Sequence, residues 1–383
     1  MTGRGSAIGP GEPVSRMAAR VLVVVLGALV VLSLGGPASA HVGGGAAGSD
    51  FDGRVLSVRP EVPGLSVRIL QFGDELELIN GTDREVVVPG YSDEPYLRIG
   101  PDGVWRNANS PATYINLDRY GRTTLPARAD AAAAPSWVRV STEPHYLWHD
   151  HRTHWMSENL LPPEVAAAPD RGHTVFEWTV PVQHGDTPVV VAGELTWSPP
   201  PPAWLVWPLY AALALLAVAA GLLVRTPRLL GVLLAVGAAA ALWHAAATPE
   251  PPVSAASHAG AIVSAMLPAG TAALVAGLGL RAALRGRGAL TGLLAVVLGW
   301  LLLVQGLPDV DVLWAANVSS AGPEPAARLA VAVLVAFGVG LVAGGIAAVR
   351  RFREATGPPS EPVPPRETAP PSSPAPARPM PLG

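Results

Sequence analysis

Residues 204–224 read WLVWPLYAALALLAVAAGLLV, an apolar run that contains no charged side chain. A helix of about twenty such residues crosses the hydrocarbon core of a bilayer, because each residue adds about 1.5 Å. Further apolar runs follow at residues 229–247, 255–280, 289–307 and 329–349. The sequence therefore predicts an all-α domain of five transmembrane helices over residues 204–350.

The charges between these runs predict the orientation of the helices. Arginines follow the first, third and fifth runs, whereas the other two connections are acidic or neutral. Because cytoplasmic loops carry the excess of basic residues, the arginine-rich end should face the cytoplasm. We expect a multi-pass protein of the cell membrane, with its N-terminal domain extracytoplasmic and its C-terminal tail cytoplasmic. The arginines concerned are Arg225, Arg228, Arg281, Arg285, Arg287, Arg350, Arg351 and Arg353.

The N-terminus has the layout of a secretory signal peptide. Arg16 and Arg20 precede an apolar stretch at residues 21–34, and Ala38-Ser39-Ala40 forms a small-residue cleavage site. We expect residues 1–40 to be removed, which makes His41 the first residue of the mature chain. An uncleaved signal anchor is the alternative.

Residues 41–198 have the pattern of an all-β domain. Short, valine-rich and often alternating runs are separated by turn residues such as Asn80-Gly81, which is typical of an antiparallel sandwich. We predict an extracytoplasmic β-sandwich of the Ig/cupredoxin-like kind, then a proline-rich spacer (199–203). The tail at residues 351–383 is rich in proline, serine and alanine and should be disordered. The clearest predicted strands are residues 55–58, 65–70, 75–79, 85–88, 137–140, 174–180 and 189–197.

Composition excludes several classes of function. The net charge of −3 gives no reason to expect nucleic acid as a partner, and the absence of cysteine excludes disulfides, thiolate metal sites and thiol nucleophiles. We find no catalytic signature and do not expect an enzyme. Every basic residue is arginine, which together with 41 glycines and 41 prolines is typical of a GC-rich bacterial genome such as that of an actinobacterium.

Residues 144–156, PHYLWHDHRTHWM, hold four of the nine histidines. In an extended strand His145, His149 and His151 share one face while His154 and Met156 share the other, and a turn after His151 would bring the two sets together. In a helix His145 and His149 would stack instead. Neutral imidazoles bind copper and zinc, and a thioether favours Cu(I). The segment therefore predicts a metal site, with copper preferred and zinc as the alternative.

Two other interpretations of this segment stay open. The histidines and tryptophans would also suit a structural knot of hydrogen bonds and stacked rings, or a pH-sensitive surface. Asp150 would either orient a neighbouring imidazole or be a solvated charge. His173 and His184 are expected at the surface. Other polar residues fall at the outer ends of the predicted spans, where a metal relay or simple interfacial anchoring is conceivable: His244, His258, Asp309 and Asp311.

A mature chain that begins with histidine directly after a signal peptide and continues as a β-sandwich resembles the CopC-type copper-resistance proteins. The resemblance implies that the α-amine and Nδ1 of His41 chelate copper, with a further imidazole completing a histidine brace. The cluster at residues 145–156 lies outside this resemblance.

We therefore expect a membrane-anchored extracytoplasmic protein that binds a metal ion, most simply copper, and buffers it or delivers it to a partner protein. Its candidate ligands are His41, His145, His149, His151, His154 and Met156. The alternative is a structural or interaction protein of the cell envelope whose His/Trp cluster is structural. The lipid bilayer is a partner in both cases.

Overall fold

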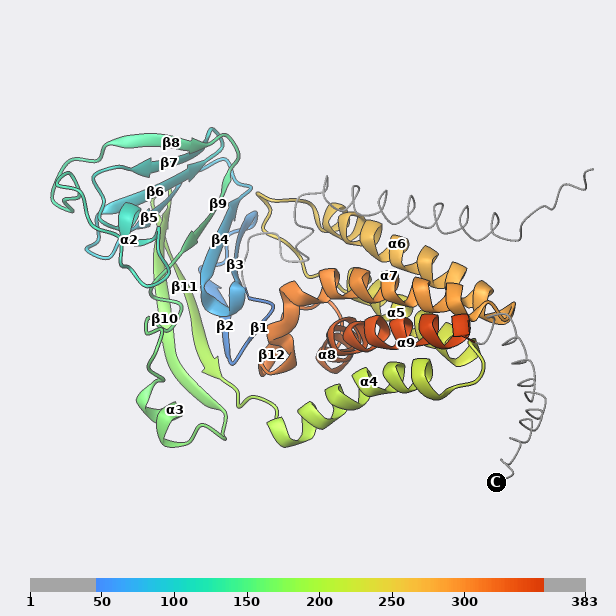
Figure 1. Ribbon diagram of the computed structural model, residues 1–383. Coiled ribbons are helices and arrows are strands. Elements are labelled where there is room, and N and C mark those ends of the chain that lie inside the picture. Colours follow the sequence, from blue (N-terminus) through green and yellow to red (C-terminus); the bar gives the residue numbers. More distant parts are fainter. Residues whose placement is uncertain (1–45, 355–383) are drawn as a thin grey trace, which may run out of the picture.

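The computed structural model describes residues 46–354, in which a β-sheet domain stands at one end of a helix bundle (Figure 1). The predicted signal peptide, His41 and the predicted tail beyond residue 354 lie outside the described residues. Residues 198–202 join the last long strand to the first long helix without regular structure, and the last residue of the predicted spacer (199–203) already belongs to that helix.

The larger sheet has seven strands in the order β2-β11-β10-β5-β6-β7-β8. Its neighbouring strands are all antiparallel. The long hairpin β10–β11 turns at residues 185–186, where Gly185 supplies a positive φ of 55°. The strands are β2 (Phe51–Arg59), β5 (Val86–Pro89), β6 (Pro95–Gly100), β7 (Gly103–Asn107), β8 (Trp137–Ser141), β10 (His173–His184) and β11 (Thr187–Trp197).

A smaller antiparallel sheet has the order β3-β4-β9, with β3 at Leu65–Leu70, β4 at Glu75–Asn80 and β9 at His145–His149. The two sheets share one apolar core, because alternate residues of their strands point inward. The predicted runs all fall on strands, and the structure adds β6, β7 and β9. The core side chains include Leu76, Leu78, Leu97, Ile99, Trp148, Trp178, Val180 and Val191.

Five helical segments are long and apolar enough to cross a membrane, as predicted. The fourth continues from α7 through a 3-10 turn (Leu307–Leu313), and the fifth contains a π turn (Val333–Phe337) between α8 and α9. The long helices are α4 (Ala203–Leu223), α5 (Arg228–Ala246), α6 (His258–Leu284), α7 (Gly288–Gly306), α8 (Glu324–Ala332) and α9 (Gly338–Glu354).

Glycines let these helices pack closely. A Cβ on Gly344 of α9 would collide with the carbonyl oxygen of Ala217 on α4, and one on Gly221 would collide with the backbone of Gly344. Small residues at helix contacts are the usual way for membrane helices to associate, because lipid removes most of the hydrophobic driving force.

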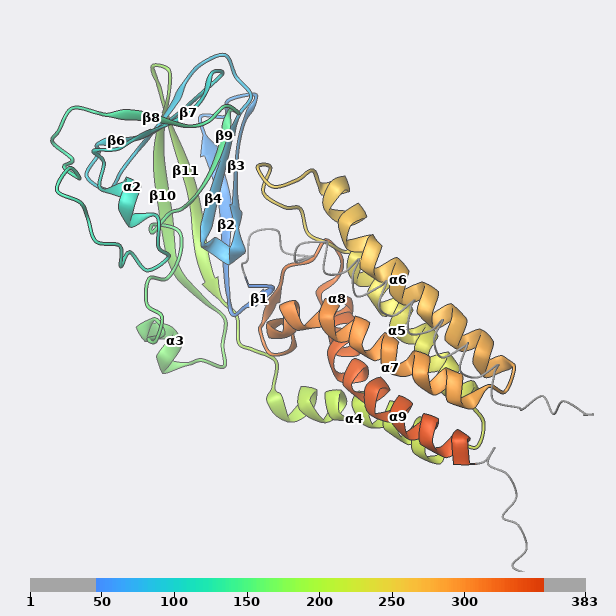
Figure 2. The ribbon, with the colours of Figure 1, turned by 45° about the horizontal axis from the view of Figure 1, so that its top comes forward.

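The sheet domain is joined to the bundle by more than the spacer. The short strand β1 (Gly48–Ser49) pairs with β12 (Asn317–Val318) of the loop between the fourth and fifth spans. From the smaller sheet, Arg68 donates to the carbonyl of Pro251 at 2.8 Å, and Glu77 accepts from the amide of Val253 at 2.8 Å. The smaller sheet therefore faces the loop that joins α5 and α6 (Figure 2).

Candidate metal centre

The histidine-rich segment is a strand followed by a turn. Strand β9 ends at His149, and the amide of Thr153 donates to the carbonyl of Asp150 at 3.0 Å. The structure thus has the strand alternative and not the helix. His145 and His149 lie at opposite ends of β9, opposite Ile79 and Glu75 of β4. Four residues of strand separate them by about 13 Å, so His145 is not brought to the other histidines.

Asp74 is the residue around which the cluster gathers. The pairing of Glu75 with His149 brings the preceding residue, Asp74, beside the end of β9. One carboxylate oxygen of Asp74 lies 3.4 Å from Nδ1 of His149, and the other lies 3.7 Å from Nε2 of His154. Arg119 also contacts this carboxylate, at 3.2 Å. Asp74 is only 7% exposed, so these side chains are its main electrostatic partners.

His151 and Met156 line the same region. The His151 ring meets the His154 ring edge-on with centroids 5.4 Å apart and stacks on Tyr91. Its Nε2 lies 3.0 Å from the carbonyl of Asp118 and must donate to it, which leaves Nδ1 as the acceptor of a neutral ring. A Cβ on Gly121 would stand 3.0 Å from His151 Cε1 and 3.6 Å from Met156 Cε, so imidazole and methyl thioether flank the same glycine.

Three buried polar atoms in this cluster have no hydrogen-bond partner: Oδ1 of Asp74, Nε2 of His154 and Nε of Arg119. The first two are acceptor or donor atoms that could bind an ion. Oδ1 of Asp74 and Nε2 of His154 face one another across 3.7 Å, and the His154 side chain is 2% exposed. Leaving buried polar atoms unpaired costs about 1–3 kcal/mol each, so an ion or a water that bridges them would stabilise the fold. The carboxylate–imidazole donor set therefore fits a transition-metal ion.

The arrangement is not a complete coordination sphere. Within residues 46–354, no group of three or more histidine, aspartate or glutamate side chains is positioned to hold a metal ion. Arg119 supplies one reason, because its guanidinium already takes part of the charge of Asp74. Metal binding here requires the side chains of His149 and His151 to turn toward the Asp74–His154 pair.

The electrostatics differ among the three imidazoles. The hydrogen bond to Asp74 raises the pKa of His149, whereas burial lowers the pKa values of His151 and His154. Burial acts to raise the pKa of Asp74, but His149 and Arg119 together hold it below its usual value. At neutral pH His151 and His154 are thus neutral, which is the form that binds metals.

Asp150 holds the turn that carries these histidines. It is fully buried, accepts from the indole of Trp148 at 2.9 Å and binds the guanidinium of Arg152 at 2.7 and 2.6 Å. Both roles expected from the sequence are therefore wrong, since Asp150 neither orients an imidazole nor is solvated. It positions the backbone from which His151 and His154 project.

The remaining histidines are placed differently from one another. His173 contacts the carbonyl of Ala168 at 2.7 Å. His184 was expected at the surface, but it is 8% exposed and its Nε2 lies 2.9 Å from the hydroxyl of Thr82. The surface prediction for His184 is wrong because the loop after β4 covers the end of the β10–β11 hairpin.

Asp74, Arg119 and Tyr91 are parts of this cluster that the sequence did not predict. None lies within the histidine-rich segment, and no local spacing links them to it. The pairing of β4 with β9 brings Asp74 beside His149, and the loop after α2 (Ala112–Ile115) brings Arg119 to Asp74. The turn between β5 and β6 places Tyr91 against the His151 ring.

The chain has no significant match among protein-family models, curated proteins or solved structures.

Proposed function

We propose that the protein is a membrane-anchored, extracytoplasmic metal-binding protein, with copper as the preferred ion, that buffers the metal or delivers it to a partner. The observation that carries this proposal is the pair of buried, unpartnered atoms at Asp74 Oδ1 and His154 Nε2, with His149 and His151 beside them. Buried polar atoms are normally paired, and an imidazole–carboxylate pair is a typical ligand set for a transition metal.

The donors favour copper over zinc through Met156. A thioether is a soft ligand that prefers Cu(I), and imidazole serves both copper oxidation states. His149, His151, His154, Asp74 and Met156 would hold the ion, whereas His145 stands about 13 Å away along β9 and has no part in this centre. We assign the sheet domain to the Ig/cupredoxin-like class, an assignment supported by its two antiparallel sheets around one core.

We further propose that the sheet domain is extracytoplasmic. The sheet domain contacts the loops after α5 and after α7, whereas the arginine-rich connections lie at the other ends of the helices. The chain has no cysteine, so single cysteines report sidedness directly. In intact cells a membrane-impermeant maleimide should label Ser92→Cys, in the exposed turn before β6, and not Arg285→Cys, at the far end of α6. Labelling of Arg285→Cys and not of Ser92→Cys would show that the sheet domain faces the cytoplasm, which contradicts the proposed orientation.

Copper content tests the metal proposal. The full chain is purified in detergent, loaded with Cu(I) under reducing conditions, passed over a desalting column and measured for copper per chain. The double variant His149→Ala/His154→Ala should lose about one equivalent. The matched control, His145→Ala/His173→Ala, also removes two imidazoles from the sheet domain and should retain the wild-type copper content. Equal copper in both double variants would contradict the assignment.

A second candidate function is supported by Arg119. Its guanidinium lies 3.2 Å from Asp74 and already balances that carboxylate without a metal. The cluster would then be a structural knot in a cell-envelope interaction protein. On this alternative the His149→Ala/His154→Ala variant loses stability but no copper.

A further inference from the structure

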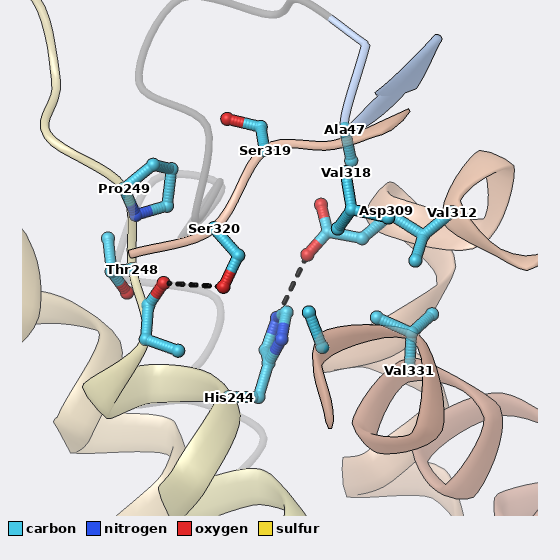
Figure 3. Close-up of a pocket in the computed structure, with 12 residues that line it drawn as sticks. Ala47, His244, Thr248, Pro249, Asp309, Val312, Val318, Ser319, Ser320 and Val331 are labelled. Atoms are coloured by element: carbon cyan, nitrogen blue, oxygen red, sulfur yellow. Dashed lines mark hydrogen bonds and ion pairs between the residues drawn. The ribbon is translucent and has the colours of Figure 1, made fainter. Parts of the chain in front are cut away.

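The two ends of the helix bundle differ in charge. Between residues 203 and 353, every acidic residue belongs to the end that meets the sheet domain. One of them lines a small cavity there, in which Nε2 of His244 is 2.9 Å from Oδ2 of Asp309 (Figure 3). This cavity has room for about one water-sized sphere, so it does not admit a larger ligand. The acidic residues of this end are Glu250, Asp309, Asp311 and Glu324.

The opposite end of the bundle is rich in arginine. Its connections and helix ends carry eight arginines, and within residues 203–354 the one acidic residue at this end is Glu354, the last residue of α9. Clusters of basic residues at a membrane surface attract anionic headgroups. The arginines are Arg225, Arg228, Arg281, Arg285, Arg287, Arg350, Arg351 and Arg353.

A groove opens between α4 and α9 at this arginine-rich end. The two helices lie side by side (Figures 1 and 2), and they are in contact at Gly221, where an added Cβ would collide with the carbonyl oxygen of Gly344. The groove beyond this contact holds about 430 Å³. Pockets that bind small molecules hold about 300–1,000 Å³. The lining side chains are Leu222, Ala343, Ile346, Ala347, Arg350 and Arg351.

The apolar walls of the groove open outward from the bundle. Leu222 is 55% exposed and Ile346 is 43% exposed, although both belong to helices that are apolar enough to cross a membrane. Ala343, Ile346 and Arg350 are spaced three and four residues apart, so they lie on one face of α9. Because the alanines of this face are small, an acyl chain has room to lie along the groove.

Two arginines follow these apolar side chains at the end of the groove. Arg351 donates to the carbonyl of Leu222, which fixes its guanidinium at the end of α4. Arg350 is exposed on the adjacent face of α9. A guanidinium binds phosphate through two parallel hydrogen bonds, and an arginine at the end of a span packs its stem on apolar surface while its charge reaches the headgroup layer. One phosphate in that layer can therefore meet both side chains.

We propose that the groove between α4 and α9 binds an anionic phospholipid whose phosphate lies on Arg350 and Arg351. One acyl chain lies along Leu222, Ala343 and Ile346. A zwitterionic lipid offers the same chains without the net charge, so it fits the arginine-rich end less well. A lipid that contacts both helices would stabilise the bundle as the anchor of the sheet domain. This site is separate from the Asp74 centre and does not depend on metal binding.

Native mass spectrometry of the full chain in detergent tests the proposal, with phosphatidylglycerol and phosphatidylcholine of identical acyl chains as the probes. One phosphatidylglycerol should bind about 25-fold more tightly than phosphatidylcholine, because each of the two arginines contributes about fivefold. The double variant Arg350→Gln/Arg351→Gln should lose this preference. The matched control, Arg281→Gln/Arg285→Gln, removes the same charge from the end of α6 and should keep it.

A second variant tests the groove without changing any charge. Ala343→Phe fills the space along the groove, and because Ala343 is exposed the substitution does not disturb packing. Phosphatidylglycerol binding should weaken by about tenfold, the loss expected when about two methylene groups no longer pack against the protein. Ala211→Phe, at an exposed alanine nearer the other end of α4, should leave binding unchanged.

Three results would overturn the proposal. The first is equal affinity of the wild-type chain for the two lipids. The second is an equal loss of phosphatidylglycerol binding in the two double variants, which would show that general charge and not this groove attracts the lipid. The third is phosphatidylglycerol binding that appears only when the chain is shortened after Glu354, since the segment that follows would then be the occupant of the groove.

Discussion

The sheet domain and the helix bundle differ in how many charged side chains they bury. The sheet domain buries several carboxylates and gives them partners: Glu77 binds Arg68, Glu94 accepts from Ser110, and Asp150 binds Arg152. Among the described residues of the bundle, 203–354, Asp309 is the one charged side chain that is buried, and it lies at the junction with the sheet domain. The interior of the bundle is otherwise packed with alanine, glycine, leucine and valine.

This difference indicates where chemistry takes place. A bundle that packs through backbone contacts at glycines offers few donor atoms for a ligand, which is consistent with the anchoring role that we propose for it. In a domain that already buries several polar side chains, donor groups for an ion need little additional desolvation. The metal-binding side chains should therefore lie in the sheet domain.

The largest expected loss of stability comes from a substitution that breaks the charge network of the sheet domain. Asp150→Ala removes the partner of Arg152 and of the Trp148 indole, so it leaves a mostly buried guanidinium without a counter-charge. The free energy of unfolding should fall by about 3–5 kcal/mol. Tryptophan fluorescence during urea unfolding of the full chain measures it. Asp186→Ala, at an exposed turn, should change stability by less than about 0.5 kcal/mol. Equal stability of the two variants would show that the network is not needed.

The next effect tests close packing in the bundle. Gly344→Ala pushes α9 away from α4 because its Cβ collides with the carbonyl of Ala217. Overpacking of this kind should cost about 1–3 kcal/mol in thermal unfolding of the detergent-solubilised chain. Gly277→Ala is the control, since a Cβ at Gly277 meets nothing within 4 Å. Similar melting temperatures for the two variants would contradict the glycine-mediated contact.

A third prediction concerns pH. Because Asp74 raises the pKa of His149 above 6.5, His149 must lose a proton before it binds a metal. Copper affinity at the Asp74 centre should fall by about tenfold for each pH unit below the pKa of His149. In the metal-free chain the stability depends on pH in the opposite direction to the copper affinity. The His149–Asp74 contact stabilises the fold below pH 6.5, and its contribution is lost as the pH rises through the raised pKa of His149.

Copper titrations of the full chain between pH 5.5 and pH 8 measure this dependence, with about 0.5 unit between points. An affinity that stays constant across this range would exclude His149 as a ligand.

The smallest effect distinguishes a metal centre from a structural knot. Arg119→Gln removes a positive charge that lies 3.2 Å from Asp74. If Asp74 binds copper, its affinity should rise by about fivefold, or about 1 kcal/mol, because the guanidinium no longer competes. Arg54→Gln, an exposed arginine paired with Asp52, should leave the affinity unchanged. Weaker binding in Arg119→Gln would favour the structural alternative.

The fold was largely predictable because its signals are local. An apolar run of about twenty residues suffices to predict a membrane helix, and alternation with turn residues suffices to predict strands. Strand β9 was harder to predict, because HYLWH at residues 145–149 alternates only weakly and this segment with the following DHRTH suits a helix equally well. In the structure the segment pairs with β4 and is therefore a strand.

The candidate sites were predictable only in part, because they depend on contacts between distant segments. The cluster of His149, His151 and His154 is visible in the sequence, but its centre, Asp74, is brought there by strand pairing. Likewise, the sequence predicts that His244 and Asp309 lie near the same membrane surface. Only the packing of α5 against the turn after α7 brings them to 2.9 Å.

The most direct test locates the metal itself. Crystals of the full chain grown with copper, and measured at the copper absorption edge, give an anomalous difference map that shows copper atoms alone. We predict a peak between Oδ1 of Asp74 and Nε2 of His154. A copper-loaded crystal with ordered density for these side chains and no peak between them would contradict the proposed centre.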